Sequence, residues 1–416
     1  MPGPPTGPGC AAPSSRTLTS TMPRHAGLIR RFTDVRGRAP AFAAEAPGRV
    51  NLIGDHVDYA EGLVLPMAID RSCLAVADLG GSSNRVRFES LDLGDSFELD
   101  LTRPIEPGLH ADKPWAAYPI GVLAGYLDDR DPSTLSGLDV LLTSTVPIGS
   151  GLSSSAAIEL AIATLIEHIL GIESEPLDRA RLCQRAEQRF AGVPCGLMDQ
   201  ATSELAECRH AMLFDCRSER AESIRMPPSD QLATFVIDTK VRHELASSAY
   251  ADRRAVCERA AHSLGVRRLR ELEPGSIGDV GLLPEDEQRV ARHVVSEIHR
   301  VYLFAEALRS GRLDQLGPLM AASHRSLRDD MRVSCPELDA VVRAAQTLPE
   351  TIGVRMTGGG FGGCAVALVD AEAASSFPQR IQMAIGPSLD PDAFPVRASA
   401  GARGWVLPPR NREPMR

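Results

Sequence analysis

The sequence predicts an α+β protein of two domains. At 416 residues the chain is too long to fold around one compact core, so two domains are the default expectation. Residues 44–79 read as a series of strands separated by polar turns, and strand-like patterns recur over residues 85–91, 96–101 and 139–146. Helical periodicity dominates much of the remaining chain, so strands and helices are both well represented.

Two helices are predicted directly after these strands. The first begins near Ser153, and its apolar side chains lie on almost every side of the helix: Ile158, Leu160, Ala161, Ile162, Leu165, Ile166 and Ile169. A helix that is apolar all round is buried at the centre of a domain. Residues 177–190 form the second predicted helix, which Gly192 and Pro194 bring to an end.

The second half of the chain shows the same mixture. Residues 232–238 have the apolar character of a strand, and helices are predicted over residues 249–264 and about 286–309. Residues 351–370 read as a strand, a glycine-rich turn and a second strand. Residues 387–395 are bounded by prolines and are expected to form a surface loop.

The domain limits follow from these patterns and from the composition of the N-terminus. Residues 1–25 are rich in Pro, Gly and Ser and lack an apolar segment, so they read as a disordered tail and not as a signal peptide. Met22 is an alternative start. We divide the remaining chain into an N-terminal domain of residues 26–215 and a C-terminal domain of residues 216–410.

Composition excludes several classes of partner. The net charge of −9 argues against nucleic acid or an anionic membrane surface as the main partner. The longest apolar stretch, residues 155–170, is interrupted by Glu159, Glu167 and His168, so it does not read as a membrane span. The nine cysteines show no CxxC pair, which is typical of reduced thiols, and we therefore expect a cytoplasmic protein.

Residues 146–160, VPIGSGLSSSAAIEL, have the character of a loop that holds phosphate. Gly149 and Gly151 let the backbone turn its amides inward, and the helix that begins near Ser153 directs unpaired N–H groups at the same place. No Gly-Lys-Ser/Thr is present, and 43 of the 45 cationic side chains are arginine. Phosphate would therefore be held by arginine, backbone amides or a metal ion. The alternative is an ordinary N-cap in front of a core helix.

Glu187 is a carboxylate on an apolar stripe of its helix, which it shares with Cys183 and Phe190. A carboxylate in such surroundings needs a cation or strong hydrogen-bond donors. An arginine partner is one explanation. A magnesium ion, shared with a serine of the phosphate loop and with nucleotide phosphates, is the other.

Two further segments carry polar side chains that are suited to chemistry. Asp55, His56 and Asp58 lie within four residues between two apolar strands. Short side chains of these types bind sugar hydroxyls, although they are also common in solvated turns. Asp199 falls in the first turn of a predicted helix, where the helix N-terminus stabilises its anion, and a simple capping role is the alternative.

Three motifs resemble the galactokinase family of the GHMP small-molecule kinases. VPIGSGLSSSAA is similar to the phosphate loop of the GHMP kinases, GRVNLIGDHVDY (48–59) to the galactokinase signature, and RMTGGGFGGC (355–364) to the third GHMP motif. Three more segments also resemble galactokinases: GVPCGLMDQ (192–200), VRHELASSAYADRR (241–254) and HRSLRDDMRVSCPELD (324–339). The similarity runs from about residue 42 to residue 370.

The resemblance implies a two-domain GHMP kinase fold, with a ribosomal-protein-like N-terminal domain, a ferredoxin-like C-terminal domain and the active site between them. It implies phosphorylation of galactose at the C1 hydroxyl by MgATP, in a chain that we expect to be a monomer. Two alternatives stay open: a kinase for a related sugar, such as N-acetylgalactosamine or arabinose, and an inactive sensor of galactose and ATP. The intact serines of residues 153–155, together with Glu187 and Asp199, favour an enzyme.

The resemblance also implies roles for residues that face the sugar. Asp199 would face the reacting hydroxyl, and Arg49 would lie against Asp199 and the transferred phosphoryl group. Asp58 would lie near the axial hydroxyl, and galactokinases usually carry Glu where Asp55 stands. The residues expected to bind galactose are Arg49, Asp55, His56, Asp58, Gly196, Asp199 and Tyr250.

The resemblance also implies which residues bind ATP and its metal. Residues expected at ATP are Gly149, Ser150, Gly151, Leu152, Ser153, Ser154, Ser155, Ala156 and, flanking the adenine, Trp115. The family's usual WxNY reads WAAY at Trp115. Close backbone approach to a ligand is expected at Gly358, Gly359, Gly360 and Gly362. Mg²⁺ would be held by Ser154 and Glu187.

Overall fold

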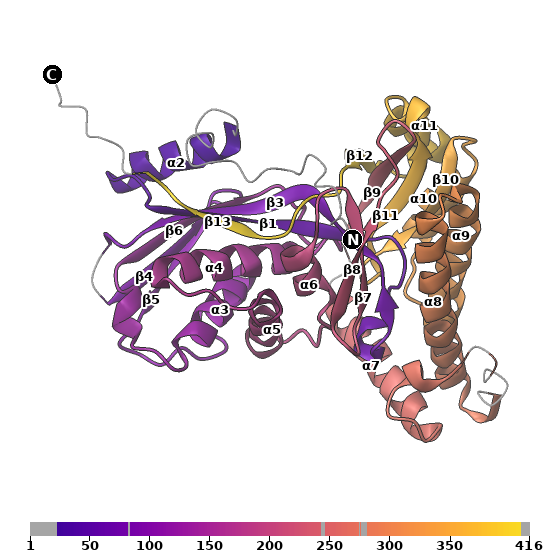
Figure 1. Ribbon diagram of the computed structural model, residues 1–416, viewed down its shortest axis with the longest axis horizontal. Coiled ribbons are helices and arrows are strands. Elements are labelled where there is room, and N and C mark those ends of the chain that lie inside the picture. The colour runs from indigo at the N-terminus through magenta and orange to yellow at the C-terminus, as the bar shows by residue number, and fades with distance from the viewer. Residues whose placement is uncertain (1–22, 82–83, 243–245, 274, 276–280, 409–416) are drawn as a thin grey trace, which may run out of the picture.

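A computed structural model describes residues 23–408, apart from 82–83, 243–245, 274 and 276–280. The predicted tail over residues 1–22 and the alternative start at Met22 lie outside the described residues. Strands and helices are mixed throughout, which confirms the α+β prediction (Figure 1). The helices are α2 (Pro23–Arg36), α3 (Ala117–Leu127), α4 (Ser154–Leu170), α5 (Pro176–Ala186), α6 (Met198–Leu205), α7 (Ala246–Ser263), α8 (Glu285–Arg309), α9 (Leu316–Ser326), α10 (Pro336–Gln346) and α11 (Phe377–Ile385).

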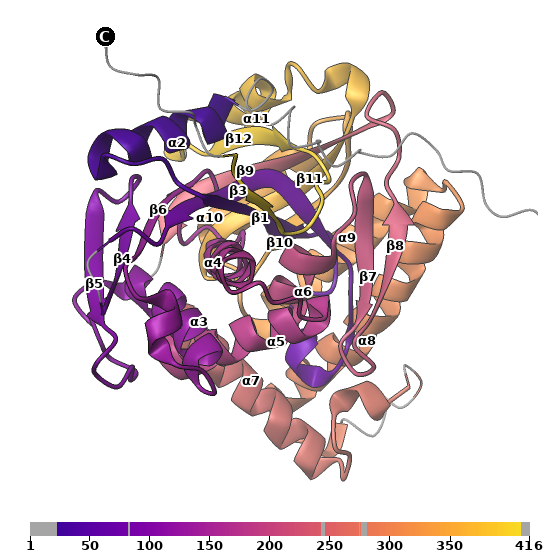
Figure 2. The same ribbon diagram turned by 60° about the vertical axis from the view of Figure 1, so that its left-hand side comes forward.

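The N-terminal half is built on a six-stranded sheet in the order β13-β1-β3-β6-β4-β5. Its strands are β1 (Phe42–Asn51), β3 (Pro66–Asp78), β4 (Arg85–Ser90), β5 (Asp95–Asp100), β6 (Leu138–Ser144) and β13 (Arg403–Val406). All pairs are antiparallel except β4 with β6. Helix α2 covers one face of this sheet and α4, with α3 beside it, covers the other (Figures 1 and 2).

Helix α4 forms the centre of this half, as its apolar composition predicts. Every residue from Ala156 to Glu167 is buried, and the helix packs on β1 and β3. Burial of apolar side chains on all sides of one helix is the main favourable term in such a core. The N-terminus of α4 is thereby fixed at the end of the sheet where β1 ends. The residues that follow Asn51 carry Asp55, His56 and Asp58 and are called the sugar segment below.

The C-terminal half contains a four-stranded antiparallel sheet in the order β10-β11-β9-β12. Its strands are β9 (Leu232–Arg242), β10 (Thr351–Thr357), β11 (Gly362–Asp370) and β12 (Asp392–Val396). Helices α10 and α11 pack on one face of the sheet, and α9 packs on β10 (Figure 1). A third sheet joins β2 (Leu63–Val64), β7 (His210–Asp215) and β8 (Arg220–Arg225), and the long helix α8 contacts it.

The structure departs from the sequence-based prediction at three places. Pro23, Arg24 and His25, assigned to the tail, lie in α2, where the Arg24 guanidinium donates to the Ser72 hydroxyl at 3.1 Å. The predicted loop over 387–395 is wrong at its end, because β12 starts at Asp392 and pairs with β9.

The last strand returns to the first sheet. Residues 403–406, which the sequence assigned to the C-terminal domain, form β13 and pair with β1 from Phe42 to Glu45. The pattern of a four-residue strand is too short to stand out in the sequence. The division of the chain near residue 215 stays a prediction.

Helix α2 is held to the sheet by Phe32, which is completely buried against Ala43, Leu74, Val76 and Leu141. Phe32→Ala is expected to lower the free energy of unfolding by about 3–5 kcal/mol, because it removes apolar contact and leaves a cavity. Chemical denaturation followed by circular dichroism measures this loss. Val35→Ala, in the same helix but 39% exposed, is the control and should change stability far less. If Phe32→Ala loses no more stability than Val35→Ala, the packing of Phe32 does not hold α2 to the sheet.

Candidate active site

One cavity lies where the two halves meet. It has a volume of about 200 Å³ and is lined by Arg49, Asp55, His56, Asp58, Glu187, Val193, Cys195, Gly196, Met198, Asp199, Tyr250, Gly358 and Gly359. All seven residues that the sequence predicted for galactose therefore face a single space. They come from three places in the chain: the end of β1 with the segment after it, the start of α6 and the start of α7. The turn between β10 and β11 adds Gly358 and Gly359 to the lining.

Arg49 and Asp199 meet in a two-pronged contact at one end of the cavity. Arg49 Nε donates to Asp199 Oδ1 at 2.9 Å, and Nη2 donates to Oδ2 at 2.7 Å. The Ser153 hydroxyl also donates to Asp199 Oδ2. Arg49 Nη1 donates to the Gly151 carbonyl at 2.6 Å, so one buried guanidinium joins the carboxylate to the phosphate loop. Paired hydrogen bonds of this kind fix orientation as well as charge.

The phosphate loop takes the shape that its glycines suggested. Gly149 and Gly151 have φ of 65° and 79°, and Ser153 adopts a left-handed conformation with φ of 55° just before α4 begins at Ser154. The Ser150 hydroxyl donates to the Pro147 carbonyl at 2.7 Å, which holds the loop internally. The backbone amides at the start of α4 are thus available to an anion.

The glycine turn between β10 and β11 packs directly on this loop. A Cβ added to Gly358 would lie 2.7 Å from the Gly151 carbonyl oxygen, and one added to Gly363 would lie 2.8 Å from that of Ser150. Gly360, with φ of 82°, has no room either, because its Cβ would meet the Val333 carbonyl. Gly359 has more space, and its nearest neighbour is the Tyr250 ring. The run of glycines therefore allows backbone to contact backbone between the two halves.

His56 and Tyr250 form an aromatic wall of the cavity together with Tyr59. The ring centroids of His56 and Tyr59 lie 5.3 Å and 5.6 Å from that of Tyr250. His56 Nε2 lies 3.0 Å from the Gly359 carbonyl, and Nδ1 lies 3.0 Å from the Tyr59 hydroxyl. Burial lowers the pKa of His56, so the ring is neutral. Its Nε2–H donates to Gly359, and Nδ1 accepts from Tyr59.

Asp58 is the acidic group with the clearest perturbation in the cavity. Burial, followed by the charges of Asp199 and Asp55, raises its pKa to about 6. The Asp58 carboxylate lies so close to Gly196 that any side chain at residue 196 would collide with it. A glycine at this position therefore lets α6 and the sugar segment approach each other across the cavity.

Glu187 also lines the cavity, near the start of α4. Helix α5 ends at Ala186, and Glu187–Ala191 form a π-helical turn, a feature common at functional sites. Gln200 Nε2 donates to Glu187 Oε2 at 2.6 Å, the Cys195 thiol lies 3.4 Å from the same oxygen, and Ser155 also hydrogen-bonds to the carboxylate. None of these neighbours is a cation, which does not favour the arginine explanation.

These surroundings fit a magnesium ion. Burial and the charge of Asp199 raise the pKa of Glu187, and a divalent cation would offset both effects. The serines at the start of α4 would supply further oxygen ligands. Ser155, one residue beyond the predicted Ser154, is the one that contacts Glu187. Among the described residues, no group of three or more His, Cys, Asp or Glu side chains could hold a metal ion, so nucleotide phosphates would complete the coordination.

Sequence reasoning missed several polar residues around the site. Gln200 Nε2 also donates to Glu159 Oε2 at 3.0 Å, and Glu159 is completely buried with a pKa well above its usual value because of burial and Glu187. The sequence signal that could have identified Glu159 is its position as an acidic residue in the middle of an apolar helix. Arg355, completely buried beside Asp55, begins the third motif but gave no separate signal.

Trp115 lies apart from the sugar cavity. Its indole Nε1 donates to Asp95 Oδ2 at 3.0 Å, and its ring packs edge-on against Phe97. A second cavity of about 240 Å³ lies in the same region of the chain, and its lining includes Lys113, Tyr118 and Phe190. Phe190 belongs to the π-helical turn of Glu187, so this space lies next to the proposed metal site.

Family models match three segments of the chain. Residues 30–79 match the galactokinase galactose-binding signature, residues 117–207 the GHMP kinases N terminal domain, and residues 304–382 the GHMP kinases C terminal domain. The cavity-lining residues Arg49 to Asp58 fall within the first match, and Glu187 and Asp199 fall within the second.

Curated relatives extend this match to most of the chain. The galactokinase of Bos taurus is 44% identical over 362 residues, which cover 85% of this chain and 90% of that protein. The human galactokinase is also 44% identical, over 361 residues with the same coverage. The galactokinase of Streptomyces coelicolor is 39% identical over 390 residues, covering 92% of this chain and 99% of the relative.

Solved structures agree with the sequence comparison. The structure of Lactococcus lactis galactokinase complexed with galactose is 28% identical with a TM-score of 0.83, covering 91% of this chain and 99% of that chain. Methanococcus jannaschii mevalonate kinase, at 19% identity and a TM-score of 0.62 over 86% of this chain and 98% of that chain, shares the fold. The two-domain GHMP kinase fold, with its ribosomal-protein-like and ferredoxin-like domains, is confirmed. The chain belongs to the galactokinase family of the GHMP kinases.

Proposed function

We propose that this protein transfers the terminal phosphoryl group of ATP to the C1 hydroxyl of galactose. The observation that carries the proposal is the position of Arg49, whose guanidinium contacts both Asp199 in the sugar cavity and the Gly151 carbonyl of the phosphate loop. A group transferred between the two substrates would pass beside this side chain. The galactokinase relatives supply the identity of the sugar and the nucleotide.

Asp199 and Arg49 would act on the reacting atoms. Asp199 orients the C1 hydroxyl or accepts its proton, and Arg49 holds the Asp199 carboxylate in place. The same guanidinium places positive charge beside the phosphoryl group during its transfer. Positioning and charge stabilisation dominate catalysis of this reaction. Because Arg49 is only 4% exposed, little water screens this charge.

The phosphate loop and the start of α4 would bind the phosphates of ATP. Their backbone amides and the serine hydroxyls of residues 153–155 replace the lysine of a P-loop. Glu187 and Ser154, joined by Ser155, would hold Mg²⁺, which when bound neutralises phosphate charge. We place the adenine in the second cavity, whose lining includes Phe190 and Pro114, the residue before Trp115.

Galactose would lie between the sugar segment and α7. Asp58 and the backbone at Gly196 offer hydrogen bonds, and the rings of His56 and Tyr250 form an apolar wall of the cavity. Asp58 has the best position to read the axial hydroxyl, because it projects into the cavity beside Asp199. A site built around one hydroxyl rejects an epimer strongly, since buried polar groups are left unpaired when the hydroxyl is misplaced.

The comparisons do not favour the alternatives of a related sugar or of an inactive sensor. We further propose that the protein acts as a cytoplasmic monomer. None of the helices in the described part of the chain has the length and apolar character needed to cross a membrane.

Galactose 1-phosphate formation from galactose and MgATP, detected by mass spectrometry, tests the proposed function. A panel of galactose, glucose, N-acetylgalactosamine and arabinose should give the highest kcat/KM for galactose. A protein that binds galactose and ATP but forms no phosphorylated sugar would contradict the kinase proposal and support the inactive sensor instead.

Asp199→Asn is expected to lower kcat by roughly a hundredfold or more, the scale of lost general-base catalysis. Arg49→Ala is expected to lower kcat by about a thousandfold, because its charge acts on the transferred group. Galactose affinity, measured by calorimetry, should change much less in both. Arg103→Ala is the control, since its side chain is 82% exposed. Equal losses of affinity and kcat would contradict these roles.

Glu187→Gln tests the metal site. The Mg²⁺ concentration for half-maximal activity is expected to rise at least tenfold, because the amide is a far weaker ligand than the carboxylate. Galactose binding without nucleotide should persist. Glu173→Gln, an exposed glutamate before α5, is the matched control and should respond to Mg²⁺ as the wild type does. A wild-type response in Glu187→Gln would remove Glu187 from the metal.

Asp58 predicts a dependence of stability on pH. Its pKa is raised from 3.8 to about 6, so the folded protein binds this proton more tightly than the unfolded chain does. The contribution of Asp58 to stability therefore falls as pH rises through about 4 to 6, and stays low above 6. Asp58→Asn should melt about 2 °C or more above wild type at pH 8, with the difference shrinking below pH 6. Galactose affinity should fall. A melting difference that is the same at pH 5 and pH 8 would contradict the assignment.

A further inference from the structure

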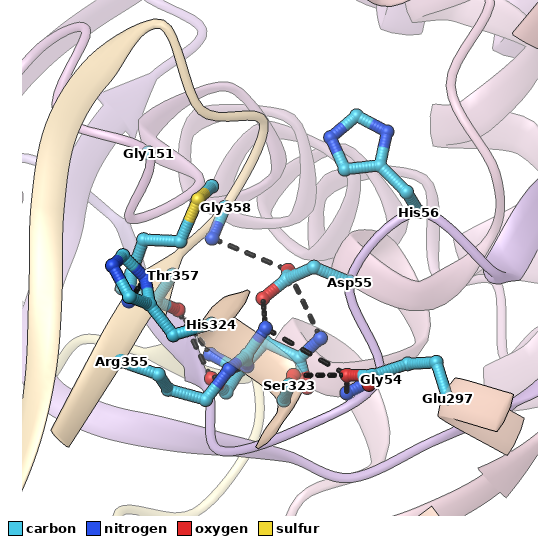
Figure 3. Close-up of polar contacts among 12 residues, drawn as sticks. Gly54, Asp55, His56, Gly151, Glu297, Ser323, His324, Arg355, Thr357 and Gly358 are labelled. Carbon is cyan, nitrogen blue, oxygen red and sulfur yellow. Dashed lines mark hydrogen bonds and ion pairs between the residues drawn. The ribbon is translucent and has the colours of Figure 1, made fainter. Parts of the chain in front are cut away.

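A network of buried charged side chains lies beside the sugar cavity (Figure 3). At its centre is Arg355 of β10, which is completely buried. Its Nη2 lies 2.7 Å from Asp55 Oδ2 and 3.8 Å from Glu297 Oε1, and its Nη1 donates to the Asn51 carbonyl at 3.2 Å. One guanidinium therefore connects four parts of the chain: β10, the end of β1, the sugar segment and helix α8.

Glu297 anchors this network on α8. Its Oε1 accepts hydrogen bonds from the Gly54 amide at 3.0 Å and from the Ser323 hydroxyl at 2.5 Å. Its Oε2 accepts from Arg300 Nε at 2.7 Å. Burial opposes ionisation of Glu297, but Arg300 and Arg355 outweigh it and lower the pKa to about 2. Glu297 is therefore an anion, and the two arginines balance the two carboxylates, as buried charges require.

The Asp55 carboxylate is held within the protein by hydrogen bonds to one oxygen and by an ion pair to the other. Its Oδ1 accepts from Asn51 Nδ2 at 3.0 Å and from the Gly358 amide at 3.2 Å, while Oδ2 lies against Arg355. The His293 ring lies 3.0 Å from the backbone carbonyl of Asp55. Although Asp55 lines the cavity, the residue is only 2% exposed. Figure 3 shows its carboxylate among these partners, with the His56 ring pointing away from them.

The same contacts tie the sugar segment to the glycine turn. Asn51 N donates to the Thr357 hydroxyl at 2.9 Å, the Gly358 amide donates to Asp55, and His56 contacts the Gly359 carbonyl. Gly358 in turn packs on Gly151 of the phosphate loop. A movement of Asp55 would therefore shift the sugar-facing His56 relative to the loop that would carry the phosphates.

We propose that Asp55 and Arg355 form a positioning pair that fixes the sugar segment against the glycine turn, and that Asp55 itself makes no hydrogen bond to the sugar. This inference rests on the proposed galactose phosphorylation. It changes the role of Asp55 from a sugar ligand to a support of the residues that face the sugar. It also assigns a function to Arg355, which is completely buried and does not line the sugar cavity.

The 2-, 3-, 4- and 6-deoxygalactoses separate a positioning role from a direct contact. If Asp55 supports the site, Asp55→Asn lowers kcat by about tenfold, and by the same factor within twofold for galactose and for every deoxy sugar. If Asp55 binds a hydroxyl directly, the loss disappears for the one sugar that lacks this hydroxyl, because the contact is already absent. Such relief for any one deoxy sugar overturns the proposal.

Asp58→Asn is the matched control, because Asp58 is the acidic residue proposed to bind a hydroxyl. Relative to wild type, Asp58→Asn should lower kcat/KM for galactose and for every deoxy sugar except the one that lacks the hydroxyl bound by Asp58. Wild-type protein that forms no galactose 1-phosphate would defeat the proposed function. Active wild-type protein with a relieved loss in Asp55→Asn would defeat only the positioning role.

Arg355→Lys tests the other member of the pair. It also provides an independent test of the proposal if Asp55→Asn does not fold. Lysine keeps the charge but cannot reach Asp55, Glu297 and Asn51 together. It should lower kcat more than it raises the KM for galactose, and uniformly across the deoxy sugars. The double variant should lose less than the product of the two single losses. A kcat within twofold of wild type in Arg355→Lys, or fully multiplicative losses in the double variant, would overturn the pair.

Discussion

The contact between Arg49 and Asp199 is the interaction on which the site depends. It joins the end of β1 to the first turn of α6 and, through the Gly151 carbonyl, to the phosphate loop. Both charged groups are held by several hydrogen bonds, as desolvated charges must be. The sugar cavity and the anion-binding start of α4 are thus parts of one structure. Their spacing is set by the rigid elements that carry Arg49 and Asp199, which is the condition for effective positioning of two substrates.

A second constraint comes from the excess of negative charge around the cavity. Asp58 and Glu187 both have raised pKa values, because each is buried and each feels Asp199. Glu159 adds a further acid behind Glu187. Such an arrangement costs stability in the empty protein, and bound cations and hydroxyl groups would relieve it. On the side of α8 the charges are instead balanced internally, since Arg300 and Arg355 accompany Glu297 and Asp55.

The features that the sequence predicted are those formed by residues that are neighbours in the chain. The apolar helix α4, the strand–turn–strand around the glycines and the compact sugar segment each lie in one continuous stretch. What it did not predict depends on partners that are distant in the chain. Arg355 and Asp55 are 300 positions apart, and Glu297 lies on helix α8, far from both in the sequence. The π-helical turn at Glu187 and the short strands β12 and β13 carry no periodic signal long enough to recognise. The roles of the site residues came from the family resemblance and stay proposals.

Strand β13 has a consequence for biosynthesis. The edge of β1 from Phe42 to Glu45 is completed only by residues 403–406, although the other strands of this sheet end at Ser144. At ribosomal rates of about 5–20 residues per second, this edge waits on the order of tens of seconds for its partner. An unpaired edge of that kind is a template for pairing with another nascent chain. Co-translational folding of the N-terminal half therefore produces an incomplete intermediate, in which the exposed edge of β1 is the point most in need of chaperone protection.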